Sequence, residues 1–124
     1  MGTGIISLQD REDWLKASET FRELHRKADT GTLLTEDDWR SLDELVKEVL
    51  PGFQQFIAAK EYVMSQNERR VCLLLRLHVK PLCICHLLGV SAAAVTMMSK
   101  SLLQKLFGRK GASRELSERL CENE

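Results

Sequence analysis

The chain has 124 residues and carries 18 Lys and Arg against 18 Asp and Glu, so it is neutral when its histidines are uncharged. This length corresponds to one domain, and an apolar content of 44% is ordinary for a protein that buries a core. No run of eighteen apolar residues is present, and the opening MGTGIISLQDRED turns acidic too early for a secretory signal. We therefore expect a cytoplasmic protein without membrane contact, whose four cysteines are reduced thiols.

Charge is distributed unevenly along the chain. Residues 1–66 hold 8 Lys and Arg against 13 Asp and Glu, a balance of −5, whereas residues 67–124 hold 10 against 5, a balance of +5. A neutral chain with one basic half is typical of a nucleic-acid-binding protein that avoids indiscriminate adhesion. Uneven scatter of charge over helix surfaces is the alternative explanation.

The first predicted helix spans residues 7–28. Trp14, Phe21 and Leu24 recur at helical spacing, which predicts one buried stripe and a core position for Trp14. His25 has no second ligand one turn away, so we expect a surface or capping role for it rather than metal binding. No sustained alternation of apolar and polar residues occurs along the chain, so the sequence predicts an all-α fold of about seven helices.

A second helix is predicted to begin after Thr35. Asp38 stands three residues later as a variant capping box, and acidic residues in the first turn complement the helix dipole. Capping is therefore the expected role of residues 36–38, rather than metal binding or acid catalysis. The buried stripe of this helix is predicted to comprise Trp39, Leu42, Leu45, Val46 and Val49.

The proline and glycine at residues 51–52 break the chain before a third helix. Its apolar positions are Phe53, Phe56, Ile57, Val63 and Met64. Ser65 and Glu68 then form a capping box for a fourth helix, predicted over residues 66–79. This helix is predicted to bury Val71, Leu74, Leu75 and Leu77, and to expose Arg69, Arg70 and Arg76.

Residues 81–100 carry the most specific local pattern. Gly89 supplies the left-handed conformation that ends a short helix, and Ser91 is a favourable N-cap for the next one. Two helices joined by so short a turn cross steeply and need a small residue at the crossing, where Cys85 stands. This residue, the glycine and the β-branched Val95 form the pattern of a helix-turn-helix, whose second helix lies in the DNA major groove.

The chain is predicted to close with a short amphipathic helix. The long helix before it ends near Phe107, and two glycines then flank Arg109 and Lys110. Ser113 is the expected cap of the last helix. Its apolar positions are Leu116 and Leu120.

Three motifs occur in order in the second half: SQNERRV at 65–71, ICHLLGVS at 84–91 and LLQKLFG at 102–108. They resemble the C-terminal DNA-binding domain of LuxR-type response regulators and region 4 of sigma-70-family factors. A closer resemblance, to the C-terminal segment of transcriptional regulators of Bacteroides-type bacteria, covers about residues 21–120, most of the chain. The motifs that carry it are LTEDDWRSL at 34–42, PGF at 51–53 and QKLFGRKG at 104–111.

The resemblance implies an all-α helical bundle with a C-terminal LuxR- or sigma-region-4-like helix-turn-helix in residues 65–124. The three-helix region before it, residues 1–64, would support this unit or dimerise. The implied function is that of a DNA-binding transcriptional regulator, which places the helix from Ser91 to Phe107 in the major groove of double-stranded DNA. Carried over from the family, the groove-facing positions are Ala92, Ala93, Thr96, Met97 and Lys100. The positions near phosphates are Ser91, Lys80, Lys105, Arg109 and Lys110.

This groove-facing set is poor in side chains that read bases. Base discrimination usually relies on Arg, Lys, Asn or Gln, and here Lys100 alone carries a strong donor, although Ala and Thr can touch a thymine methyl group. We therefore expect modest affinity, marked salt dependence, and a need for homodimerisation or for a partner such as RNA polymerase.

Other functions are weighed against DNA binding. The main alternative is a protein–protein interaction module that uses the same fold without sequence-specific DNA binding. Cys83, Cys85 and His86 are close in sequence, but on a helix the two cysteines point about 200° apart, so no metal site is expected. The chain has no phosphate-binding glycine loop and no catalytic-triad spacing, so we expect neither enzymatic activity nor a cofactor.

Overall fold

The computed structural model describes residues 8–111 and 113–121. Within these residues every regular element is a helix, so the predicted all-α class is confirmed. The elements are α1 (Leu8–Ala17), α2 (Glu19–Thr30), α3 (Glu36–Val49), α4 (Pro51–Ala59), a 3₁₀ turn η1 (Glu61–Val63), α5 (Gln66–Arg76), α6 (Pro81–Leu88), α7 (Ala92–Phe107) and α8 (Ser113–Cys121).

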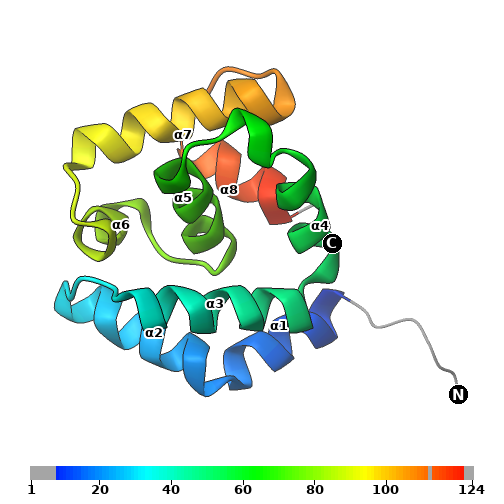
Figure 1. Cartoon of the computed structure of the whole chain (residues 1–124), viewed down its shortest axis with the longest axis vertical. Helices are drawn as coiled ribbons and strands as arrows, with labels where there is room; N and C mark the ends of the chain where they lie inside the picture. Colours follow the sequence, from blue (N-terminus) through cyan, green and yellow to red (C-terminus); the bar gives the residue numbers. More distant parts are fainter. Residues whose placement is uncertain (1–7, 112, 122–124) are drawn as a thin grey trace, which may run out of the picture.

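The helices form two groups that pack on each other (Figure 1). α1, α2 and α3 contact one another and make up one layer, while α5, α6, α7 and α8 make up the other. α4 and η1 connect the two groups, and α6 contacts both α7 and α2. The core between the groups is apolar. Its fully buried side chains include Leu15, Leu42, Phe53, Leu74, Ile84, Leu87 and Leu102.

The expected first helix, residues 7–28, is broken at Ser18 into α1 and α2, which is a correction. Ser18 has an extended backbone (φ −70°, ψ 136°), and its hydroxyl oxygen accepts a hydrogen bond from the Phe21 amide at 3.4 Å. Serine competes for helix amides in this way, so it favours an N-cap even inside a periodic apolar pattern. Residue 7, the expected start, lies outside the described residues.

The break at Ser18 changes which side chain of α1 faces the core. Leu15 is fully buried, whereas Trp14 is 53% exposed, so the predicted core position of Trp14 is wrong. Trp39 in α3, in contrast, is 5% exposed, as its stripe predicted. Two separate helices need not keep one common buried stripe, which is why periodicity across residue 18 was misleading.

Both predicted capping boxes are present. In α3, Asp38 accepts the Thr35 amide at 2.8 Å and the Thr35 hydroxyl accepts the Asp38 amide at 3.2 Å, which confirms capping as a role of this acidic turn. In α5, Ser65 and Glu68 exchange the same two bonds at 2.9 and 3.1 Å. The predicted stripe of α3 is buried throughout.

α5 ends at Arg76, three residues earlier than expected. His78 adopts a left-handed conformation (φ 67°), and the Val79 amide donates back to the Leu74 carbonyl at 3.0 Å. Histidine is among the non-glycine residues that tolerate this conformation. His25 of α2 also closes this end, because its Nε2 lies 2.9 Å from the Leu77 carbonyl oxygen. His25 therefore has a capping role, but it caps the end of α5 and not that of its own helix, α2.

Arg76 was predicted to be exposed, but it is wholly buried. Its Nη2 lies 2.8 Å from a carboxylate oxygen of Glu12, and Nε2 of His78 lies 2.6 Å from the other oxygen. Burial alone would raise the pKa of the Glu12 carboxyl, but the hydrogen bonds from His78 and Arg76 outweigh it and hold the pKa below its ordinary value. Glu12 belongs to α1, so this contact fastens one layer to the other.

A search of the described residues finds no single helix that is long and apolar enough to cross a membrane. α6 and α7 reach that length and composition only when taken together, and they are bent by 110° at their junction.

Candidate nucleic-acid interface

α6 and α7 meet across a turn of three residues, Gly89 to Ser91, and their axes differ in direction by 110°. Gly89 is left-handed (φ 73°), and the amides of Gly89 and Val90 donate to the Cys85 carbonyl at 2.9 and 3.0 Å. The Ser91 hydroxyl oxygen accepts the Ala94 amide at 3.0 Å and so begins α7. The sequence pattern therefore forms the steep two-helix unit that it predicted.

The position of α6 is fixed from both sides. Ile84 and Leu87 are fully buried, and the Leu34 amide, from the connection between α2 and α3, donates to the Leu87 carbonyl at 3.0 Å. Cys85 is half-buried against the core, and its thiol donates to the Leu82 carbonyl at 3.3 Å. α6 is thus held between the first layer and α7, and the opposite side of α7 faces outward.

The outward face of α7 carries the five side chains that the resemblance assigned to the groove. All five are exposed, Met97 to 71%, and their positions on the helix are Ala92, Ala93, Thr96, Met97 and Lys100. At 100° per residue these positions fall within an arc of about 140° on one side of the helix. The inward side of α7 carries Val95, Leu102 and Leu106, which are buried. The five side chains therefore form one continuous surface.

No aspartate or glutamate occurs between Glu68 and Glu115. This acid-free stretch contains all of α6 and α7. Its basic residues are Arg69, Arg70, Arg76, Lys80, Lys100, Lys105, Arg109, Lys110 and Arg114. Where each of these cations points decides whether the basic half is available to a ligand.

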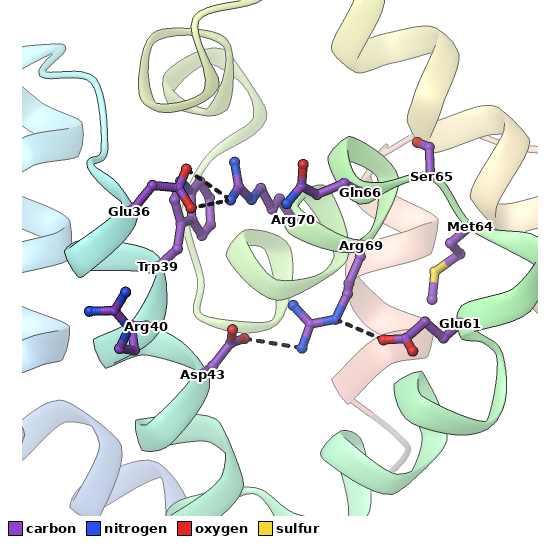
Figure 2. A pocket seen from close by; sticks show the side chains of 10 residues that line it. All are labelled: Glu36, Trp39, Arg40, Asp43, Glu61, Met64, Ser65, Gln66, Arg69 and Arg70. Atoms are coloured by element: carbon purple, nitrogen blue, oxygen red, sulfur yellow. Dashed lines mark hydrogen bonds and ion pairs between the residues drawn. The ribbon is translucent and has the colours of Figure 1, made fainter.

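Two of the cations line a polar groove between α3 and the start of α5 (Figure 2). Arg69 reaches Asp43 at 3.1 Å and Glu61 at 3.8 Å, while Arg70 lies 4.5 Å from the ring centre of Trp39 and 3.4 Å from Glu36. These contacts join the basic half to acids of the first half, as the Arg76–Glu12 pair also does. Part of the charge asymmetry therefore serves packing and leaves this groove without unpaired cations.

Lys105 also has a structural role, which differs from the phosphate contact expected of it. Its ammonium group lies 2.9 and 3.1 Å from the two carboxylate oxygens of Glu68. Burial would raise the pKa of Glu68, but hydrogen bonds from the Ser65 amide and Lys105 lower it, so the carboxylate is ionised at neutral pH. Lys105 is thus engaged by Glu68, whereas the other cations assigned to phosphates have no such partner among the described residues.

The cations that do face outward gather at the far end of α7. Lys100, Arg109 and Lys110 line a depression of about 340 Å³ together with Gln104 and Gly111. Gly108 is left-handed (φ 64°), which ends α7 and brings the following basic residues back beside the helix. Within the described residues, no carboxylate lies within ion-pair distance of Lys100, Arg109, Lys110 or Lys80.

Gln104 was missed by the sequence reasoning. It is exposed, one turn beyond Lys100, and it shares the basic depression. Its i+4 spacing from Lys100 was a usable signal, because residues at this spacing lie on the same face of a helix. Its amide can donate and accept hydrogen bonds, which suits both phosphate and base edges.

The cysteines of α5 and α6 are free thiols. Among the described residues, no three His, Cys, Asp or Glu side chains are arranged to hold a metal ion. Cys83 and Cys85 are half-buried free thiols on α6. Cys72 is buried within α5, and burial raises the pKa of its thiol to about 12, so it is neither charged nor reactive at neutral pH.

Comparison of the chain with protein-family models, curated proteins and solved structures finds no match.

Proposed function

We propose that this protein binds double-stranded DNA as a transcription regulator, and that α6 and α7 act as a helix-turn-helix of the LuxR or sigma-region-4 type. A bend of 110° across a three-residue turn with a left-handed glycine is the geometry expected of this motif. In such a unit the second helix enters the major groove. The motifs that resemble those families fall on the same elements, with SQNERRV at the start of α5 and ICHLLGVS across α6 and the turn.

The observation that carries the proposal is the outward face of α7. Its first turns are exposed and uncharged, and the face ends at a depression with three cations that have no carboxylate partner among the described residues. A polyanion that follows this face would meet cations presented by a stretch of chain that has no acid between Glu68 and Glu115. Ser91 and the first amides of α7 add donors at the positive end of the helix dipole, where phosphates are favoured.

Binding of this kind is weak for a single domain and strongly dependent on salt. If Lys100, Arg109 and Lys110 each neutralise one phosphate, log K falls with log salt concentration with a slope of about −2.7. A second copy of the chain, or RNA polymerase bound to the same promoter, would supply the further contacts that regulation requires.

The test is a salt titration of binding to duplex DNA, followed by fluorescence anisotropy. The double variant Lys100→Glu/Lys110→Glu is compared with Lys16→Glu/Lys47→Glu, which changes the net charge equally at exposed lysines of α1 and α3. We expect the first to lose binding and the second to retain it. Equal loss in both variants would indicate an effect of net charge alone, and survival of binding in the first would reject the assignment of α7.

The alternative, a protein-interaction module, is favoured by one observation in α1. Trp14 is 53% exposed and borders a depression lined by Ala17, Ser18, Leu45, Glu48 and Val49. Exposed tryptophans are enriched at the centres of protein interfaces. The substitution Trp14→Ala tests this surface. If a dimer detected by analytical ultracentrifugation becomes a folded monomer, this surface is a self-association site.

A further inference from the structure

We propose that the outward face of α7 recognises the C5-methyl groups of pyrimidines, so that its preferred ligand is a thymine-rich major groove. This inference rests on the proposed DNA-binding function and adds the class of sequence that is read. It follows from two features of the first two turns of α7: they lack long polar side chains, and they present small and apolar ones to a base edge.

The first two turns of α7 have no long polar or charged side chain of the kind that usually reads a base edge. Guanine is read by Arg or Lys, adenine by Asn or Gln, and cytosine by Asp or Glu. Residues 92–99 contain none of these types. The Thr96 hydroxyl donates to the Ala92 carbonyl at 3.2 Å, so its proton is used inside the helix. Lys100, in the third turn, is the first long donor.

The same turns have the shape and chemistry for an apolar contact. Ala92 and Ala93 are exposed and short, so they let the helix backbone approach the groove floor closely. Met97 projects a flexible thioether that is 71% exposed and adapts to irregular apolar surfaces. In the major groove the only apolar group on an unmodified base edge is the C5-methyl of thymine.

An apolar helix face also suits a protein groove, but the charge around this face favours DNA. The whole stretch from Arg69 to Arg114 lacks acids, and Lys100, Arg109 and Lys110 lie at the C-terminal end of the apolar patch without carboxylate partners among the described residues. An apolar protein groove would gain nothing from these cations. A DNA duplex suits both the apolar patch and the cations, because it places methyl groups on the groove floor and phosphates along the groove edges.

The experiment removes the methyl group and leaves every hydrogen-bonding atom in place. Anisotropy titrations use three matched duplexes at low salt: alternating dA–dT, the same duplex with deoxyuridine for thymidine, and a dG–dC duplex. A fourth duplex carries 5-methylcytosine in place of cytosine. Each buried methyl group is worth about fourfold in affinity. Two methyl contacts therefore predict that affinity falls about 15-fold when thymine is replaced by uracil. Affinity should rise when cytosine is replaced by 5-methylcytosine.

Variants place the effect on α7. Met97→Gln keeps the side-chain length and replaces the apolar contact with a polar one, so it should reduce the thymine-to-uracil ratio while salt-dependent binding remains. Tyr62→Gln is the matched control, because Tyr62 is 82% exposed on η1, outside the proposed interface. It should leave the ratio unchanged.

The outcomes separate the two proposals. Equal affinity for the thymine and uracil duplexes, with steep salt dependence in both, overturns methyl recognition and leaves DNA binding intact. An unchanged ratio in Met97→Gln overturns the assignment of that recognition to α7. Absence of binding to any duplex at low salt overturns both proposals.

Discussion

Basic residues have opposite roles in two regions of the molecule: the contact between the two helix layers, and the outward face of α7. Between the layers, Arg76, Arg70 and Arg69 each reach a carboxylate from the first half of the chain. On α7, Lys100 has no such partner among the described residues, whereas Lys105, on the other side of the same helix, is held by Glu68. A basic excess in a sequence therefore has two components, and only the cations without internal partners are available to a ligand.

The largest effect is expected from breaking the contact between the layers at Arg76. Arg76→Ala leaves the Glu12 carboxylate without its buried partner, which costs about 3 kcal/mol or more of unfolding free energy. Urea denaturation measures this loss. Arg40→Ala removes an exposed pair with Asp37 and should change stability little. Similar midpoints for the two variants would contradict the structural role assigned to the buried pair.

A smaller effect is expected from disturbing the turn that orients α7. Gly89→Val should destabilise the protein by about 1–3 kcal/mol, because a β-branched residue resists the left-handed conformation. A Cβ atom at residue 89 would also lie 3.0 Å from Cδ1 of Leu33. Gly108→Val is the control, since Gly108 is equally left-handed but has no atom within 4 Å of such a Cβ. Thermal melts that show no difference between the two variants would mean that the Leu33 contact adds no cost.

The smallest effect is expected in how the stability of the protein changes at acidic pH. The pKa of Glu12 is lowered in the folded state from an ordinary value of 4.5, so the unfolded state takes up its proton first as the pH falls. The stability from this group is thus complete above pH 4.5 and is lost as the pH falls through the folded-state pKa. Glu12→Gln should be less stable at pH 7 and should lose less stability between pH 5 and 3 than the wild type. Glu44→Gln, at an exposed position of α3, is the control. An acid profile of Glu12→Gln that parallels the wild type would assign the sensitivity to other carboxyls.

The features that sequence predicted well are those set by neighbouring residues. The capping boxes at Thr35 and Ser65, the left-handed Gly89 and the Ser91 cap depend on side chains within three or four positions. Such contacts have the same geometry in most helices, so spacing alone identifies them. The all-α class follows from the helical spacing of apolar residues, which is also a local pattern.

The features that sequence missed depend on residues far along the chain. Arg76 is buried and pairs with Glu12, 64 positions earlier, and Lys105 of α7 pairs with Glu68 of α5, 37 positions earlier. The Ser18 cap was missed for a different reason: it is a local contact, but it lies inside a periodic apolar pattern that predicted one continuous helix and a buried Trp14. Neither the Arg76–Glu12 pair nor the Lys105–Glu68 pair leaves a signal in the neighbouring sequence. The sequence therefore overstated the number of cations that are available to DNA.

The most direct test of the two roles of basic residues compares Lys100→Ala with Lys105→Ala, two substitutions on opposite sides of one helix. Fluorescence anisotropy at several salt concentrations gives the affinity for a dA–dT duplex, and urea denaturation gives the stability of each variant. We predict that Lys100→Ala weakens binding and reduces the salt slope by about 1 without loss of stability. Lys105→Ala should lower stability and leave the affinity of the folded protein unchanged. Equal DNA affinity in Lys100→Ala and the wild type would contradict the account, because the outward face of α7 would then not be the DNA-binding surface.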